Sequence, residues 1–361
     1  MRICLLTSSK YENSPRCIRT AMSLGKYWSV KVIEFHGSGK SEDNESIIEG
    51  IRVTKLGARL WPENTLLKAI IFFLKVFPVL LKTKADAYHC CGFQALIVAA
   101  PVKIFARKRL IYDCYEHYPY QFTAPALHKT TRQSIIWNFI LCLENAFAKL
   151  SDYILVVPSY NNILLDRFKR YKKKPTSVIW NLPPIKLLDR KEQTKRTIKG
   201  KIILYMGGIG KDTGSFKLLD AASKVVIEFP DVKVMMIGPT NILKTLCEYA
   251  RSLGIEKNVE ILKPVAYFDV WKIYSLADIG IVLYQPTFWT LRTKASEKLF
   301  ENMLFSLPIV VSNFPGIREI VKTCNCGILV DPTNLEEISA AIIRLLRDPH
   351  AAGMLGKNGR D

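Results

Sequence analysis

Residues 202–214 read IILYMGGIGKDTG, five residues of buried-strand type followed directly by a glycine-rich turn. The amphipathic run Phe216–Glu228 comes next, and this order is typical of a strand, a tight turn and a helix. Glycine lets the backbone approach a bound group closely, and a helix N-terminus supplies unpaired N–H donors with partial positive charge. The segment therefore predicts a diphosphate site, against the alternative of an ordinary strand-to-helix turn.

The same alternation continues along the whole chain. Short runs rich in Ile, Val and Leu alternate with longer amphipathic stretches, as parallel strands joined by helices do. In the first half we predict strands at Ile3–Thr7, Val30–Phe35, Ala87–Cys90, Arg109–Asp113, Ile154–Val157 and Ser177–Ile179. In the second half we predict strands at Ile202–Met206, Lys233–Ile237, Val259–Leu262, Ile279–Leu283, Ile309–Ser312 and Gly327–Val330. The fold class is therefore α/β.

Length and composition indicate two domains. A chain of 361 residues exceeds the size at which one hydrophobic core stops growing. Between the two sets of strands lies a polar stretch with two prolines and the charged run DRKEQTKR, which is typical of an interdomain linker. We predict an N-terminal domain at 1–185, a linker at 186–200 and a C-terminal domain at 201–361.

The charge balance limits the partners. The 52 Lys and Arg residues outnumber the 32 Asp and Glu residues, and the net charge of +20 attracts polyanions. Hydrophobic residues make up 49% of the chain, which excludes a disordered protein. Because the sequence contains no recognised nucleic-acid-binding motif, we expect phosphorylated substrates and anionic lipid as partners, and no nucleic acid.

Three stretches of the first half bear on a membrane surface. Leu66–Lys82 reads LLKAIIFFLKVFPVLLK, too short and too charged to cross a bilayer. It is either an interfacial helix with snorkelling lysines or a buried helix that ends near Pro78. Ile135–Leu150 follows the basic residues Lys129 and Arg132, and Arg167–Lys174 is a basic run. If these surfaces coincide, they hold the first domain on anionic lipid; otherwise they are solvated faces.

Cysteine usage and the N-terminus bear on the compartment. Nine cysteines occur without the spacing of a zinc site or the density of a disulfide scaffold, and Cys324 and Cys326 are interpreted as loop residues. Met1 leads straight into a predicted strand, without the order of a signal peptide. We expect a cytoplasmic protein, peripheral on the inner face of the cytoplasmic membrane where the basic surfaces coincide.

One glycine-rich segment does not fit a phosphate-binding loop. Gly37–Ser41 reads GSGKS, but the first glycine of the motif would fall on Glu34, and an acidic stretch follows where an apolar helix is required. We interpret it as a solvent loop.

The segment Glu297–Ser312 carries a lysine and two acids on a helix that runs into a buried strand. Lys298-Leu-Phe-Glu301, Leu307-Pro-Ile-Val-Val311 and Pro315-Gly-Ile-Arg-Glu-Ile320 resemble the corresponding motifs of the family 4 glycosyltransferases. Further similar segments are Ser14-Pro-Arg16, Tyr112-Asp-Cys-Tyr-Glu116, Asn181-Leu-Pro183 and Ile237-Gly-Pro239. The resemblance implies the GT-B fold, two Rossmann-like domains with parallel sheets facing a central cleft, and a retaining transfer from a nucleotide-diphosphate-sugar.

The resemblance also implies roles for individual residues. Glu301 would accept hydrogen bonds from the nucleotide ribose, and Lys298, one helical turn earlier, would reach the diphosphate. Gly207 and Gly208 would allow close backbone approach, and the loop with Val265 and Tyr267 would flank the base. His89, Asp113 and Glu116 would contact sugar and acceptor, a glycan or a lipid-linked molecule. The implied biology is cell-surface polysaccharide or glycolipid synthesis.

Departures from the family pattern concern the leaving group. The position eight before Glu301 is Thr293, so Glu297 is the candidate replacement for a first carboxylate. Gly208 and Thr213 stand where the family carries basic residues, and Lys211 or Lys217 are the candidate substitutes.

Two further departures concern an acceptor signature and the end of the chain. Tyr115 stands where the family has His, with His117 two residues on. The family's helix beyond an Asn-Gly-Arg region is absent after Asp361, which indicates a truncated C-terminus.

The implied mechanism needs no metal cofactor, in agreement with the absence of any Asp-x-Asp in the sequence. Two alternatives remain open. A sugar-nucleotide epimerase would turn over the nucleotide-sugar without an acceptor, whereas a non-catalytic relative at the membrane would bind it without turnover.

Overall fold

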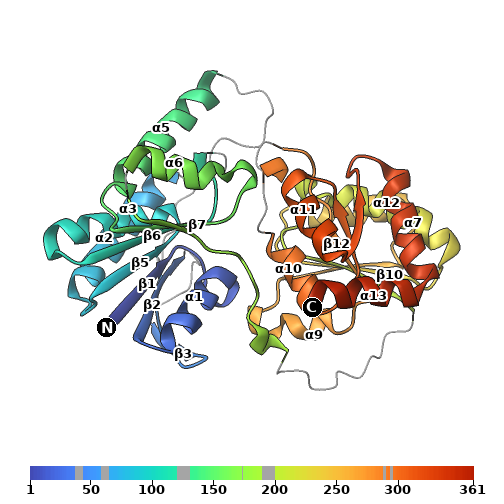
Figure 1. Ribbon diagram of the computed structural model, residues 1–361, viewed down its shortest axis with the longest axis horizontal. Helices are drawn as coiled ribbons and strands as arrows, with labels where there is room; N and C mark the ends of the chain where they lie inside the picture. The colour runs from blue at the N-terminus through green and yellow to red at the C-terminus, as the bar shows by residue number, and fades with distance from the viewer. Residues whose placement is uncertain are drawn as a thin grey trace. The chain divides into compact units, whose positions relative to one another are not determined.

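The computed structural model describes residues 1–36, 44–57, 65–119, 131–172, 174–188, 200–287, 290–292 and 296–361 (Figure 1). The chain forms two compact α/β units, the first made of residues 1–158 and 162–180, the second of 159–161 and 181–361. Each unit has its own sheet of mainly parallel strands and its own core, and each is described by itself.

The first unit is built on an eight-stranded sheet with the order β3-β4-β2-β1-β5-β6-β7-β8. All neighbouring strands are parallel except the pair β3 and β4. The strands are β1 Arg2–Thr7, β2 Ser29–His36, β3 Asn44–Ile48, β4 Ile51–Gly57, β5 Ala87–Cys91, β6 Arg109–Cys114, β7 Tyr153–Val156 and β8 Thr176–Val178. Because β1 and β5 are neighbours although β2 to β4 intervene in sequence, the carboxyl ends of β1, β5 and β6 share one edge.

Helices cover the first sheet. They are α1 Pro15–Gly25, α2 Thr65–Lys82, α3 Phe93–Ala106, α5 Thr131–Ala148 and α6 Ile163–Lys172. Pro15 suits the first turn of α1 because that position needs no backbone N–H. Short 3₁₀ turns lie at Tyr11–Asn13 (η1) and Tyr160–Asn162 (η2).

The second unit has a six-stranded parallel sheet with the order β11-β10-β9-β12-β13-β14. The strands are β9 Ile202–Met206, β10 Lys233–Ile237, β11 Val259–Leu262, β12 Ile279–Val282, β13 Ile309–Ser312 and β14 Gly327–Val330. The helices are α7 Ser215–Glu228, α8 Leu243–Ser252, α9 Val270–Tyr274, α10 Glu297–Leu304, α11 Pro315–Cys324, α12 Leu335–Arg347 and α13 Pro349–Arg360. Short 3₁₀ turns lie at Ile185–Leu187 (η3), Lys211–Thr213 (η4), Tyr267–Asp269 (η5) and Thr290–Arg292 (η6).

The predicted strands are confirmed to within one or two residues at their ends, and the hairpin β3–β4 is the part of the sheet that the sequence did not predict. The predicted solvent loop Gly37–Ser41 lies outside the described residues.

The interpretation of α2 as a buried helix ending near Pro78 is wrong in one respect, because the helix continues through Pro78 to Lys82. Val76 and Leu80 are buried on one face, whereas Leu74 and Leu81 are 65% and 44% exposed. The helix therefore has both a core face and an apolar face in solvent. No helix in the described part of the chain is long and apolar enough to cross a bilayer.

Candidate functional site

The glycine loop begins where β9 ends. Gly207 has φ +112°, and its N–H donates to the carbonyl oxygen of Ile237 at 2.8 Å. A Cβ on Gly238 would lie 2.0 Å from the carbonyl oxygen of Gly207, and Gly238 also has a positive φ of +157°. Only glycine fits both conditions, so the ends of β9 and β10 approach more closely than side chains would allow.

Lys298 of α10 lies against this loop. A Cβ on Gly207 would come within 2.4 Å of the Lys298 Cε, so the missing side chain makes room for the lysine. The ammonium donates to the Tyr205 hydroxyl at 3.0 Å and lies 4.5 Å from the centre of the Tyr205 ring. It lies 5.4 Å from the Tyr284 ring. The two rings hold the cation beside the backbone of the glycine loop.

Removal from water lowers the pKa of Lys298, and Tyr284 and Glu301 partly oppose this change. A cation in this state gains from an anionic ligand, because the ligand restores the interactions that burial took away. At the predicted diphosphate site the structure therefore has a lysine ammonium that is shielded from water and that an anionic ligand would stabilise.

Glu301 lies one helical turn after Lys298 on α10. Ser296 caps the N-terminus of this helix, because its Oγ accepts from the N–H of Leu299. Glu301 is 6% exposed and accepts a hydrogen bond from the Tyr274 hydroxyl at 2.8 Å. Burial and the Glu301 carboxylate raise the pKa of Tyr274 well above its usual value, so the hydroxyl remains a donor. Tyr274 in turn stacks on Phe305 at 4.9 Å, which fixes the carboxylate.

A hollow of about 680 Å³ opens beside the glycine loop. Its wall is formed by residues 208–213 together with 239–241, and it includes the predicted residues Gly208 and Lys211. The side chain of Thr213 is engaged within the loop itself, because its hydroxyl accepts from the N–H of Gly210 at 3.0 Å and closes a tight turn. The exposed Lys211 is therefore the loop's cation at this hollow.

The remaining predicted donor-site residues are placed as follows. Val265 is half-buried after β11, and Tyr267 is buried at the start of η5, with its ring edge-on to that of Phe268 at 6.3 Å. Glu297 is the half-buried first residue of α10. Thr293 lies outside the described residues.

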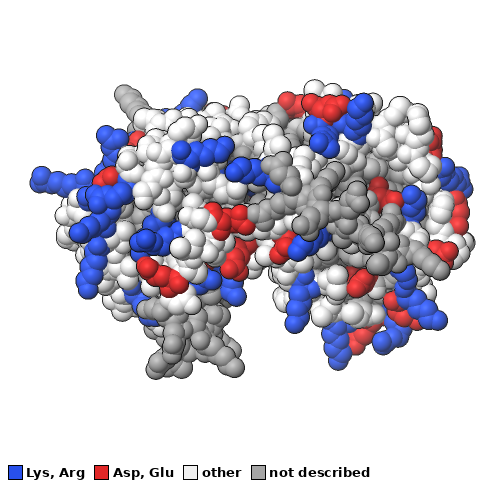
Figure 2. All heavy atoms as spheres, turned by 90° about the horizontal axis from the view of Figure 1, so that it is seen from below, with Lys and Arg blue, Asp and Glu red and all other residues white. Residues whose placement is uncertain are grey.

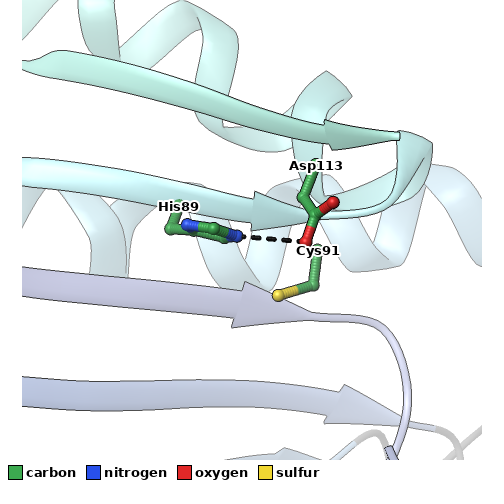
Figure 3. Close-up of side chains that lie close together, drawn as sticks. All are labelled: His89, Cys91 and Asp113. Carbon is green, nitrogen blue, oxygen red and sulfur yellow. Dashed lines mark hydrogen bonds and ion pairs between the residues drawn. The ribbon is translucent and has the colours of Figure 1, made fainter. Parts of the chain in front are cut away.

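In the first unit, His89 and Asp113 meet at the carboxyl ends of β5 and β6 (Figure 3). The Nε2 of His89 lies 3.3 Å from an Asp113 oxygen, and both side chains are buried. Arg16 of α1 donates to Asp113 from Nε at 2.9 Å and from Nη2 at 2.6 Å, and from Nη1 to the carbonyl of Ile179 at 3.2 Å. Asp113 is thus held between two cationic groups.

The charges of this cluster follow from its geometry. Burial opposes ionisation of Asp113, but Arg16 and His89 lower its pKa to about 2. Burial alone would lower the pKa of His89, but hydrogen bonds to Asp113 and Cys91 raise it to about 9. His89, Cys91 and Asp113 have ligand atoms within 4.8 Å of one another, as a metal site would require. The guanidinium already bound to Asp113 opposes a second cation there.

Glu116 and its neighbours follow β6. Glu116 is half-buried, and its carbonyl oxygen accepts from the Cys114 thiol at 3.4 Å. Tyr115, the residue in place of the family's His, lies with its ring 6.0 Å from the Arg16 guanidinium. His117 is buried and packs on Trp137 at 5.0 Å, so it faces α5.

Sequence reasoning missed four supporting residues, namely Arg16, Tyr205, Tyr274 and Tyr284. Arg16 lies in the segment Ser14-Pro-Arg16, to which the sequence assigns no role in the site. Tyr274 and Tyr284 lie in no motif, whereas the position of Tyr205, two residues before Gly207, is a usable signal.

Comparison with known proteins finds similarity mainly in the second unit. The family model described as glycosyl transferases group 1 matches residues 189–361. Spore coat protein SA of Bacillus subtilis (strain 168) is 27% identical over 167 residues, 44% of this chain and 43% of the relative, so the chain spans less than half of that relative's length. The capsular polysaccharide biosynthesis glycosyltransferase CapM of Staphylococcus aureus is 21% identical over 93% of this chain and 85% of the relative.

A solved structure extends the likeness to both units. HepE of Anabaena in complex with UDP-glucose has a TM-score of 0.71 and 16% identity, and the match covers 100% of this chain and 93% of that chain. At this identity the likeness shows the fold, which is GT-B. The model of the glycosyl transferases group 1 thus matches most of the second unit of this chain, residues 189–361.

Proposed function

We propose that this protein is a retaining glycosyltransferase that moves a sugar from a nucleotide-diphosphate-sugar to a glycan or lipid-linked acceptor. The observation that carries the proposal is the position of Lys298, with its ammonium held by Tyr205 and its chain against Gly207. A departing diphosphate needs donors that are already in place, and this arrangement supplies them.

Different residues of the second unit bind different parts of the nucleotide-sugar donor. Lys298, the glycine-loop amides and the N-terminus of α7 take the diphosphate, while Glu301 takes the ribose hydroxyls. Lys211 is the further cation that takes the role of the basic residues missing at Gly208 and Thr213. Val265 and Tyr267 flank the base. The transfer needs no metal, because fixed protein donors stabilise the leaving group.

In the first unit, the acceptor binds at the carboxyl ends of β5 and β6. Asp113 and His89 are buried, so they fix the positions of neighbouring groups at this end of the sheet and do not extend into solvent themselves. Glu116, which is half-buried, is the acidic side chain of this group that contacts the acceptor. The leaving phosphate helps to deprotonate the incoming hydroxyl.

The comparisons support the class of substrate. HepE was solved in complex with UDP-glucose, and CapM is named for capsular polysaccharide biosynthesis. We therefore place the reaction in cell-surface polysaccharide or glycolipid synthesis, carried out by a cytoplasmic protein peripheral to an anionic membrane.

The test begins with a thermal-shift screen of nucleotide-sugars, because a bound donor raises the melting temperature by mass action. The donor found is then incubated with candidate acceptors, and the anomeric configuration of the product is read by NMR. Transfer with retention is the expected result. Turnover without an acceptor would indicate an epimerase, and tight binding without turnover against any acceptor would indicate a non-catalytic relative; either outcome would overturn the proposal.

A further inference from the structure

The N-terminal edge of the first sheet collects cations that are far apart in sequence. β1 begins at Arg2 and β6 at Arg109, and the pairing of each with β5 puts both at one edge. Arg52 is the second residue of β4 and lies at the same edge. Lys and Arg side chains gather at the left end of Figure 2, the end at which Figure 1 places the N-terminus.

A hollow of about 730 Å³ lies at this edge. Arg52, Lys82 and Lys84 line it, together with the indole of Trp28 and with Val79. Of the described residues that form its wall, none is acidic. Within the described ranges no carboxylate forms an ion pair with Arg52, Lys82 or Lys84, in contrast to Arg2, which pairs with Asp86 at 3.0 Å. Glu45 pairs with Lys31 of the same wall at 2.9 Å and interacts with Arg52 electrostatically. The hollow therefore combines more cations than nearby acidic groups with an apolar wall.

Large apolar side chains in solvent continue this edge. Leu81, at the end of α2, is 44% exposed, and Ile104 and Phe105, at the end of α3, are 61% and 73% exposed. The two helices pack together, and Phe105 meets Phe77 edge-on at 6.2 Å. A solvated lysine face would not need exposed aromatic and aliphatic groups of this size.

We propose that this surface docks on an anionic lipid bilayer, with a lipid phosphate in the hollow and the apolar side chains at the acyl boundary. We call it the basic edge and define it by Trp28, Arg52, Leu81, Lys82, Lys84, Ile104 and Phe105. A surface that binds a membrane interface needs both cations and large apolar side chains. Binding of nucleic acid needs the cations but gives no reason for the exposed apolar side chains.

The basic edge is at the opposite end of the strands from Asp113 and His89. β5 and β6 place those residues at the carboxyl end of the sheet, roughly 15 Å away for strands of this length. Docking therefore leaves that end of the first unit uncovered. The inference deepens the proposed function, on which it rests for the location at an anionic membrane, and it does not require an acceptor embedded in the same bilayer.

The predicted basic run Arg167–Lys174 contributes less positive surface charge than its sequence indicates. Arg167 pairs with the buried Glu144 at 2.9 Å, so its charge is neutralised inside the first unit. The C-terminal end of the predicted segment Leu66–Lys82 belongs to the basic edge.

The test is flotation of the whole protein with vesicles of phosphatidylglycerol and phosphatidylcholine, compared with vesicles of phosphatidylcholine alone. The test variant carries Arg52→Glu, Lys82→Glu and Lys84→Glu. The control carries Arg251→Glu, Lys322→Glu and Lys357→Glu, which makes the same change in net charge on exposed residues of the second unit. At about fivefold per cation, the test variant should bind the anionic vesicles on the order of a hundredfold more weakly, and the control should stay close to the unaltered protein.

Equal losses in both variants, or no loss in either, would overturn the assignment of this surface. A second readout is independent of net charge: brominated lipids should quench the fluorescence of Trp28, and the Trp28→Phe variant should lose that part of the quenching. The substitutions Ile104→Ser and Phe105→Ser should reduce binding at unchanged charge. Nucleotide-sugar binding to the same variants, measured by calorimetry, distinguishes the docking proposal from the proposed function. Donor binding belongs to the second unit, so its affinity should be unchanged in these variants.

Discussion

The ammonium of Lys298 donates to the hydroxyl of Tyr205 at 3.0 Å while it lies 4.5 Å from the centre of the same ring. The residues are 93 positions apart, and the contact joins α10 to the end of β9. It holds a cation, whose pKa is lowered by removal from water, at the glycine loop.

Replacing Lys298 should weaken donor binding. A hydrogen bond to a charged group contributes about 1.5–3 kcal/mol, so Lys298→Met should reduce affinity roughly ten- to a hundredfold by calorimetry. Tyr205→Phe keeps the aromatic ring beside the ammonium and should reduce donor affinity much less than Lys298→Met does. Lys224→Met, which removes an exposed lysine paired with Glu336, is the control and should leave affinity unchanged. Equal effects of Lys298→Met and Lys224→Met would rule out the assigned contact.

Gly207→Ala should lower both stability and donor affinity, because the added Cβ would lie 2.4 Å from the Lys298 Cε at a backbone φ of +112°. We expect a loss of about 1–3 kcal/mol in the free energy of unfolding. In the Lys298→Met background part of the cost should vanish, since the shorter side chain can move. Additive losses in this double-mutant cycle, measured by chemical denaturation, would show that the two residues are not coupled.

Glu301→Gln should impair recognition of the ribose. The amide retains the shape and one acceptor for the Tyr274 hydroxyl, but it loses the charge that strengthens hydrogen bonds from ribose. We expect the preference for the ribonucleotide over its 2′-deoxy form to shrink, alongside a roughly tenfold loss of affinity. A preference that the substitution leaves unchanged would place the ribose elsewhere.

The stability of the first unit should depend on His89 with a definite sign. Because the folded pKa is about 9, above the unfolded value of 6.5, the stabilisation is complete below pH 6.5 and is lost as the pH rises through 9. The difference in unfolding free energy between the unaltered protein and His89→Gln should therefore be larger at pH 6 than at pH 9.5, by up to about 3 kcal/mol. A difference independent of pH would mean that folding leaves the pKa of the imidazole at its unfolded value.

Most of both sheets could be predicted because buried parallel strands are continuous apolar runs. The hairpin β3–β4 could not, since Asn44–Ile48 is an edge strand with exposed and half-buried positions and follows an acidic stretch. Its pairing with β4 depends on contacts that no local pattern encodes.

The candidate site was predicted only where it carries a motif. Lys298 and Glu301 sit three apart on one helix, a relation visible in the sequence. The role of Arg16 could not be predicted, because its partner Asp113 is 97 positions away and no local sequence pattern indicates that the two side chains pair. Tyr205 was missed for the same reason, since its function is to receive a lysine from another element.

The central claim is that Lys298 and Glu301 bind opposite ends of one nucleotide-sugar. A crystal structure with the nucleoside diphosphate of the best donor tests it most directly. We expect a phosphate oxygen within about 3 Å of the Lys298 Nζ and the ribose hydroxyls at similar distances from the Glu301 carboxylate. A nucleotide bound away from the glycine loop, with Lys298 still engaged only by Tyr205, would contradict the account.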